Sequence, residues 1–321
     1  MNRMPLASIE ILFLSLGGMG IALVVLIRGG DWTIDAAVRL AQRSGLSPAL
    51  IGATVVAFGT SAPELVTSVR ANLGNEPGLA LGNVVGSNIA NLLLVIGATA
   101  LLFRLSFQPT GLRTDFLAML LSSAALLLLL QFGEISRGMG AALFAALLFY
   151  MAYRFRRNDR LEDTPEPPLA AQPLWRVLGL LGLGLIALIG GAELLVFSAV
   201  QAGKALAVPT EVIGLTVVAL GTSVPEIVSS IAAARKRQNE LLLGSLLGSN
   251  LFNVLSIVGL TALVKPLAVS DSLAGLSAPF MLLVSLAVTA YLLVRRRLTR
   301  LDGAVFLLLY LGYTLWQYGT A

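Results

Sequence analysis

The chain has 321 residues, of which 57% are hydrophobic and 12% are charged, about half the charged fraction of an average soluble domain. It contains no cysteine and no histidine, which excludes disulfides, thiolate and imidazole metal sites, and cysteine or histidine catalysis. Its formal net charge of +5 comes from basic residues that separate apolar runs, so they indicate membrane topology rather than a nucleic-acid-binding face.

Apolar runs of about 20 residues recur along the chain, and each is long enough to cross a bilayer core of about 30 Å. No A-x-A-like cleavage site follows the first run, so we interpret it as a membrane span rather than a signal peptide. No polar stretch is long enough to form a separate soluble domain. The runs predict an all-α polytopic membrane protein with ten transmembrane helices, over residues 6–27, 46–71, 78–102, 114–132, 136–153, 174–201, 208–233, 240–264, 273–294 and 302–318.

The most polar connection, RFRRNDRLEDTPEPPLAAQP, covers residues 154–173 and separates the halves 1–153 and 174–321. Its charges and prolines cannot enter lipid, so it predicts a short linker. When this linker is placed in the cytoplasm, 17 of the 22 Lys and Arg residues fall on the cytoplasmic side of the ten spans. The bias predicts a multi-pass protein with both termini outside the cytoplasm.

The two halves are related by an internal repeat. A shift of 162 positions places IGATVVAFGTSAPE on IGLTVVALGTSVPE with 11 of 14 residues identical, and GNVVGSNIANLL on GSLLGSNLFNVL. Five spans, an odd number, separate equivalent positions, so the two copies must cross the membrane in opposite directions. The sequence therefore predicts two inverted-topology repeats of five helices each.

The repeated GTS(A/V)PE segment places a proline and a glutamate inside an apolar span. Pro63 cannot donate a hydrogen bond to the Gly59 carbonyl and crowds that turn, so it frees carbonyl oxygens that need another partner in lipid. Thr60 and Glu64 are four residues apart and share one side of the broken helix. Ala57 and Ser61 have the same spacing, and the second copy repeats all four positions as Ala219, Thr222, Ser223 and Glu226.

The following span adds a second polar pair. Ser87 and Asn91 lie one helical turn apart, and Ser249 and Asn253 repeat them. Two carboxylates within a set of six to eight oxygens suit Ca²⁺, whereas carbonyl and hydroxyl ligands alone suit Na⁺. Because two uncompensated glutamates are costly in a membrane, we expect cations or protons to occupy the site in every stable state.

Structural roles compete with this interpretation. The Gly82–Gly86 and Gly244–Gly248 pairs are typical of helix packing, and serine or asparagine alone often serves as interhelical glue. The paired glutamates resist a purely structural explanation, because the motifs place no Lys or Arg to match them. Asp31 and Glu193, also equivalent by the repeat, are expected near the ends of their spans, with their carboxylates snorkelling to the interface.

The segments GTSAPE with GSNIAN and GTSVPE with GSNLFN resemble the two alpha-repeats of the calcium/cation antiporter superfamily, specifically the sodium/calcium exchanger type. The likeness covers nearly the whole chain, with alpha-repeats over 46–102 and 208–264. It implies an alternating-access antiporter that exchanges Na⁺ for Ca²⁺ at a shared mid-membrane site. The transported cations and the lipid bilayer are then the expected partners, no cofactor or nucleic acid is expected, and a single chain suffices for transport.

The resemblance also implies roles for single residues. Glu64 and Glu226, with the carbonyls of Thr60 and Thr222, would hold Ca²⁺. The remaining implied positions are the Na⁺ ligands Ala57, Ser61, Ser87, Ala219, Ser223 and Ser249, and the residues lining the central site, Asn91 and Asn253.

This sequence departs from the family pattern in two places. Potassium-dependent and some archaeal members have aspartate where this chain has Asn253, which makes K⁺ co-transport less favoured. The short linker leaves no room for the cytoplasmic regulatory domain of animal exchangers, which suggests a prokaryotic inner-membrane protein. The runner-up interpretation is a proton-coupled or K⁺-dependent exchanger that uses the same glutamate pair.

Two further classes of protein are distinguishable from an antiporter. An ion channel could use such acidic residues to conduct cations, but its cation flux would not be coupled to the movement of a second ion. An intramembrane hydrolase is disfavoured, because the apolar spans place neither a Ser-Lys nor an aspartate pair. We therefore do not expect an enzyme.

Overall fold

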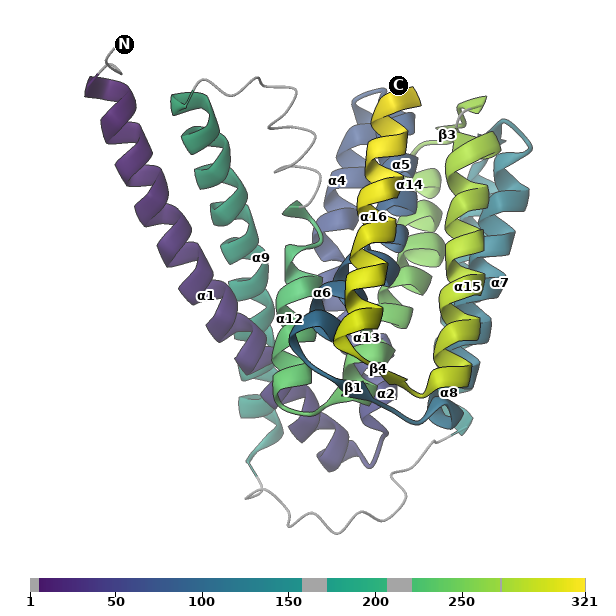
Figure 1. Ribbon diagram of the computed structural model, residues 1–321. Helices are drawn as coiled ribbons and strands as arrows, with labels where there is room; N and C mark the ends of the chain where they lie inside the picture. The colour runs from purple at the N-terminus through teal and green to yellow at the C-terminus, as the bar shows by residue number, and fades with distance from the viewer. Residues whose placement is uncertain (1–5, 158–171, 207–220, 272, 321) are drawn as a thin grey trace.

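The computed structural model describes residues 6–157, 172–206, 221–271 and 273–320, and nearly all of them are helical (Figure 1). The first half contains α1 (Leu6–Ser44), α2 (Pro48–Ile51), η1 (Gly52–Val56), α3 (Ala57–Thr60), α4 (Ala62–Leu73), α5 (Pro77–Ala90), η2 (Asn91–Val95), α6 (Ile96–Leu102), β1 (Leu105–Ser106), η3 (Pro109–Leu112), α7 (Arg113–Leu130), β2 (Glu134–Ile135) and α8 (Arg137–Arg157). The second half contains α9 (Leu174–Ala205), α12 (Val224–Arg235), α13 (Asn239–Phe252), η5 (Asn253–Val258), α14 (Gly259–Val264), β3 (Leu267–Ala268), η6 (Leu273–Ser277), α15 (Ala278–Arg295), β4 (Arg297–Leu298) and α16 (Arg300–Thr320).

Seven stretches of the described residues are long and apolar enough to cross a membrane, and the bent pair Pro48–Thr60 and Ala62–Leu73 brings this number to eight. Each lies close to one of the predicted spans. The predicted span 302–318 coincides with the 21-residue helix α16, which is not among the eight. The predicted span 208–233 lies partly outside the described residues, as does the linker 154–173.

Helix α1 does not stop at residue 27, where the first predicted span ends, but continues to Ser44. The extra turns contain no proline, and the helix ends where Gly45 adopts a positive φ of 67° that other residues rarely adopt. Asp31 therefore lies inside this long helix, beyond the predicted end of the span.

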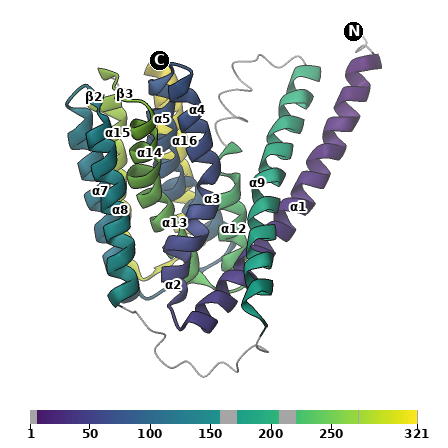
Figure 2. The same cartoon turned by 180° about the vertical axis from the view of Figure 1, so that it is seen from behind.

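Helices α1 and α9 form a long pair that leans away from the rest of the bundle toward one end (Figures 1 and 2). Small residues allow their close approach. Gly29 of α1 lies against Ala187 and Leu188, while Gly184 of α9 lies against Thr33 and Gly29. Close packing through small residues is the usual way in which membrane helices associate, because lipid provides no hydrophobic drive between them.

Gly184→Ala should push α1 and α9 apart. An added Cβ would lie 2.5 Å from the Thr33 hydroxyl oxygen and 2.7 Å from the Thr33 amide nitrogen. We expect a loss of about 1–3 kcal/mol of stability, measured as a lower thermal unfolding temperature in detergent. Gly182→Ala is the matched control, since nothing lies within 4 Å of its added Cβ. Equal unfolding temperatures for the two variants would contradict this packing.

The centre of the bundle is formed around α13. All residues of the most apolar stretch within Asn239–Val264 are buried, whereas only 17% of the residues in the most apolar stretch of α1 are buried. Gly244 lies against the Ala49 carbonyl, and a Cβ at Gly248 would lie 2.5 Å from the Ala53 carbonyl oxygen. Residue numbers rise together along this contact, so α13 runs parallel to α2 and η1. The predicted packing role is confirmed for Gly244 and Gly248, but not for Gly82 and Gly86, because nothing lies within 4 Å of a Cβ added at either.

A buried charge cluster joins α7 to α8. Arg154 and Asp115 are each 1% exposed, with Arg154 Nε 3.2 Å from Asp115 Oδ1 and Arg154 Nη2 3.2 Å from Asp115 Oδ2. Tyr150 donates a hydrogen bond to the same carboxylate. The sequence analysis placed Arg154 in the polar linker, whereas the structure places it inside the bundle. The second half has a similar but looser cluster, in which Tyr291 of α15 donates to Asp302 of α16 and Arg295 Nη2 lies 3.9 Å from Asp302 Oδ1. The acid is on the later helix there and on the earlier helix in the first half, so the two clusters are not equivalent by the repeat.

Two short antiparallel ladders tie loops together at the ends of the bundle. Leu105 pairs with Leu298 in the β1–β4 ladder, and Ile135 pairs with Leu267 in the β2–β3 ladder. The beginning of α1 and the end of α16 lie at the same end of the molecule (Figure 1). The described helices thus enter and leave the bundle on one side.

Candidate functional site

The first GTSAPE segment breaks its helix, as the proline predicts. The axes of Pro48–Thr60 and Ala62–Leu73 differ by 44°, and Ser61 between them has φ −85° and ψ 5°. The Ser61 amide donates to the Ala57 carbonyl (3.0 Å) and the Leu65 amide to the Ser61 carbonyl (3.2 Å). Pro63 has no amide hydrogen for the Gly59 carbonyl.

The second copy has the same geometry at its described residues. Ser223 has φ −84° and ψ −1°, and α12 begins directly after it with Pro225 in the first turn. Ser223 and Glu226 are buried, while Thr222 is half-buried. Ala219 lies outside the described residues, so its predicted role remains a prediction.

Both glutamates lie in the interior of the bundle. Glu64 and Glu226 are each 2% exposed, and their carboxyl groups are close enough to interact electrostatically. The hydroxyl groups of Thr60 and Ser61, from the first half, lie close to the Glu226 carboxyl group of the second. The two GTS(A/V)PE segments therefore meet, as the repeat predicts. Like charges so near one another in a buried site are stable only when cations or protons compensate them.

The Thr60 hydroxyl connects the broken helix to α13. Its Oγ1 donates to the Val56 carbonyl (3.2 Å) or the Ala57 carbonyl (3.4 Å) and lies 3.5 Å from Ser249 Oγ. The Ala57 carbonyl, which the sequence analysis expected to be freed, already accepts from the Ser61 amide and has Thr60 Oγ1 beside it. A cation at this carbonyl would have to compete with the Thr60 hydroxyl.

Four asparagines cross-link α5–η2 and α13–η5 at the centre. Asn91 Nδ2 donates to Asn250 Oδ1 (3.0 Å), and Asn253 Nδ2 donates to Asn88 Oδ1 (2.9 Å). Adding 162 to Asn88 and Asn91 gives Asn250 and Asn253, so the repeat converts each of these hydrogen bonds into the other. Residue numbers rise along one helix where they fall along the other, so α5 and α13 run antiparallel. Asn91 and Asn253 also begin the π-helical turns η2 and η5, a local widening that often occurs at functional sites.

Asn88 and Asn250 were missed by the sequence analysis. The side-chain amide of each donates a hydrogen bond of 3.3 Å to the backbone carbonyl of the other. Each also accepts the hydrogen bond from Asn253 or Asn91 described above. The signal was present in the repeated GSN motif, because Asn88 and Asn250 are also 162 residues apart. The one-turn spacing of Ser87 with Asn91 and of Ser249 with Asn253 predicted those residues as site residues instead of Asn88 and Asn250.

Several buried oxygens of this centre make no hydrogen bond within the described part of the chain. They come from both halves and are Ser61 Oγ, Glu64 Oε2, Asn91 Oδ1, Glu226 Oε2 and Asn253 Oδ1. Buried polar atoms are almost always paired, so carboxyl and amide oxygens without donors indicate an electropositive partner at this centre. Hard cations such as Ca²⁺ prefer carboxylate, amide and hydroxyl oxygens of this kind. The arrangement can hold a cation but, with no nucleophile–base pair among these residues, does not resemble a hydrolytic site.

Of the predicted site residues, most lie at the centre of the bundle. Those that are buried there are Ala57, Thr60, Ser61, Glu64, Ser87, Asn91, Ser223, Glu226, Ser249 and Asn253.

Asp31 makes contacts that the sequence analysis did not predict. It forms ion pairs with Arg235 and, at 3.6 Å, with Lys236, whose Nζ also lies 2.5 Å from Asp35 Oδ1. These contacts hold α1 to the end of α12. Glu193, its equivalent in α9, is exposed.

Comparisons with known proteins give a consistent result. The profile of the family described as sodium/calcium exchanger protein matches residues 14–156 and 176–319. The chain is 33% identical to a putative antiporter, CaxA, of Alkalimonas amylolytica over 91% of its own length and 95% of the relative's. It is 30% identical to the sodium/calcium exchanger MaX1 of Methanosarcina acetivorans, and 32% identical to the inner membrane protein YrbG of Escherichia coli, with at least 91% of this chain and 93% of each relative covered.

Solved structures resemble the fold as well. A structure of the sodium-calcium exchanger NCX_Mj, soaked without Na⁺ and Ca²⁺, superposes with a TM-score of 0.81 at 30% identity. The superposition covers 94% of this chain and 97% of that one.

Proposed function

The chain belongs to the sodium/calcium exchanger protein family, a family of membrane transporters, and from this premise we propose that it is a secondary active antiporter that exchanges Na⁺ for Ca²⁺ by alternating access. The substrates are the two cations, which compete for one set of oxygens. The observation that carries the proposal is the group of unpartnered buried oxygens from both halves, built around Glu64 and Glu226.

The proposed ligand set is the one that the family resemblance implies, and the burial of most of its described residues at the centre of the bundle supports it. Ca²⁺ binds between the carboxylates of Glu64 and Glu226, with the carbonyls of Thr60 and Thr222 as further ligands. Na⁺ ions take the outer positions, which draw on the alanine carbonyls and serine hydroxyls at Ala57, Ser61, Ser87, Ala219, Ser223 and Ser249. Asn91 and Asn253 line the centre with the amide oxygens that remain free after their cross-links.

The proposed topology is ten spans in two inverted repeats, 1–153 and 174–321, with both termini outside the cytoplasm. The antiparallel contact of α5 with α13 at equivalent positions supports the inversion. The shared end of the two termini supports an even number of crossings (Figure 1). The excess of basic residues around the linker supports its cytoplasmic placement.

Coupling arises from the cost of a half-filled site. Uncompensated carboxylates in a dry interior are unfavourable, so only the Ca²⁺-loaded and the fully Na⁺-loaded protein changes its access readily. We assign the motion to the α1–α9 pair, which has its own glycine-lined interface and leans away from the bundle (Figure 2). The contacts of Asp31 and Asp35 with α12 are then made at one end of this moving pair.

The test is Ca²⁺ flux into proteoliposomes under single imposed gradients, with the membrane potential clamped. We expect Na⁺-gradient-driven Ca²⁺ uptake and no uptake driven by a pH or a K⁺ gradient. Uptake that follows the pH gradient instead would replace Na⁺ by H⁺ as the coupled ion. Ca²⁺ flux that is independent of every gradient would indicate a channel and overturn antiport.

A further inference from the structure

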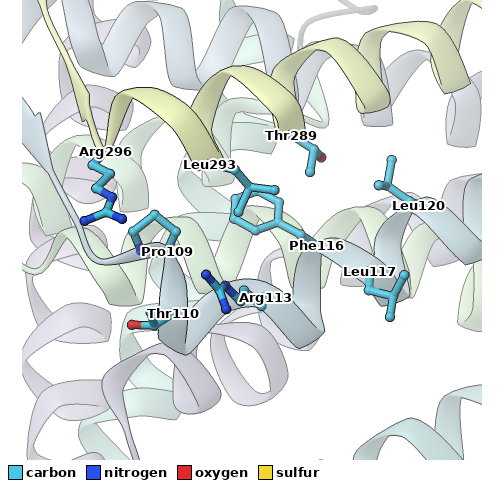
Figure 3. A pocket seen from close by; sticks show the side chains of 9 residues that line it. All are labelled: Pro109, Thr110, Arg113, Phe116, Leu117, Leu120, Thr289, Leu293 and Arg296. Carbon is cyan, nitrogen blue, oxygen red and sulfur yellow. The ribbon is translucent and has the colours of Figure 1, made fainter.

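A pocket lies between α7 and α15 at the end of the bundle where β1 pairs with β4 (Figures 1 and 3). It has a volume of about 440 Å³, within the range of about 300–1,000 Å³ that is typical of small-molecule sites. Nine residues line it: Pro109, Thr110, Arg113, Phe116, Leu117, Leu120, Thr289, Leu293 and Arg296.

The two ends of this pocket differ in chemistry. Arg113 and Arg296 lie at one end, and Figure 3 shows the remaining wall extending away from them along the two helices. Within the described part of the chain, neither guanidinium group makes a hydrogen bond or an ion pair. The wall beyond is apolar and partly open on the outside of the bundle, where Leu117 is 58% and Leu293 38% exposed.

Thr289 adds a polar group to the apolar end. It is 4% exposed, and its hydroxyl oxygen has no hydrogen-bond partner among the described residues. A buried hydroxyl beside a pocket is normally satisfied, so a ligand that carries a hydrogen-bond acceptor would complete it.

The backbone at Arg296 also indicates a selected side chain. Arg296 caps α15 with φ 55° and ψ 1°, a left-handed conformation at a helix end where glycine is usual. Retaining a large side chain there costs strain, and such strain is common at ligand sites. Here it accompanies a guanidinium group that lines the pocket beside Arg113.

We propose that this pocket binds one anionic phospholipid, with the phosphate held by Arg113 and Arg296, an acyl chain against Phe116, Leu117 and Leu293, and the Thr289 hydroxyl donating to an ester carbonyl. Basic pockets between membrane helices on the cytoplasmic side are suited to anionic headgroups. The outer wall of the pocket faces the region that lipid chains fill. The proposal concerns lipid binding only, so it is independent of which cations are transported.

The test is native mass spectrometry of the detergent-purified protein with added phosphatidylglycerol or phosphatidylcholine. We expect the unsubstituted protein to retain one phosphatidylglycerol per chain, with an affinity at least roughly tenfold above that for phosphatidylcholine, because two guanidinium groups favour the net negative charge. Arg113→Gln with Arg296→Gln should lose this selectivity. Arg300→Gln, an exposed arginine outside the pocket, is the matched control and should keep it.

Two further arms separate the possible sources of failure. Arg296→Gly relieves the left-handed strain, so this variant should remain folded. It should nevertheless bind phosphatidylglycerol more weakly than the unsubstituted protein does. Excess inorganic phosphate should not displace the lipid, because it buries no chain. Equal phosphatidylglycerol retention by the unsubstituted protein and the double variant, equal retention of the two lipids by the unsubstituted protein, or full displacement by phosphate would overturn the proposal.

Discussion

Glu226→Gln is expected to abolish Na⁺-driven Ca²⁺ uptake while leaving the protein folded. The substitution keeps the size of the side chain but removes one of the two charges that would compensate Ca²⁺ in the proposed site. Loss of a proposed ligand should exceed the roughly 10–100-fold effect of replacing a residue that only supports a ligand, so we expect uptake to fall at least about 100-fold. The measurement is the initial rate of Na⁺-gradient-driven uptake in proteoliposomes.

Stability provides an independent check on the same variant. A cation that binds the folded state raises its unfolding temperature, so Ca²⁺ should stabilise the unsubstituted protein and not Glu226→Gln. Without Ca²⁺, Glu226→Gln should be at least as stable, because it removes a buried, repelled carboxylate. Glu193→Gln is the matched control, since Glu193 is exposed on α9. Undiminished uptake by Glu226→Gln would refute the proposed role of this carboxylate.

Arg154→Met should have the largest effect on stability. It leaves the Asp115 carboxylate buried at 1% exposure without its two guanidinium contacts of 3.2 Å. Breaking a buried ion pair by removing one partner typically costs about 3–5 kcal/mol. We expect a correspondingly lower unfolding temperature in detergent, with Na⁺/Ca²⁺ selectivity unchanged in whatever folded protein remains.

The double variant Asp115→Leu with Arg154→Met is the control for this effect. It removes both charges at once, so no carboxylate is left unpaired and most of the lost stability should return. Tyr150 loses its acceptor in this variant, so recovery should stop short of completion. Additive losses from the two substitutions would show that the pair is not the source of the stability.

The sequence predicted the helices well where lipid imposes a minimum length and loops carry clear turn residues. It did not predict that α1 continues beyond residue 27, because the polar turns there contact α9 and α12, which local hydropathy does not reveal. The ion pairs of Asp31 were missed for the same reason. Its partners, Arg235 and Lys236, lie more than 200 residues away.

The candidate site was predictable to the extent that it repeats. Pro63 identified the break between α3 and α4, Pro225 identified the beginning of α12, and the repeat identified the two buried glutamates. Asn88 and Asn250 needed the antiparallel contact of α5 with α13, which no spacing within one helix reveals. The Asp115–Arg154 pair has no counterpart at the equivalent positions of the repeat, and in the sequence Arg154 looks like an ordinary loop charge.

The asparagine cross-link has a consequence for the origin of the fold. Each of its two bonds joins a residue in one half to a non-equivalent residue in the other, and the two are interchanged by the repeat. Contacts of this kind are those that two identical subunits make around a two-fold axis. The same contact would form between two copies of a half-length chain inserted in opposite orientations.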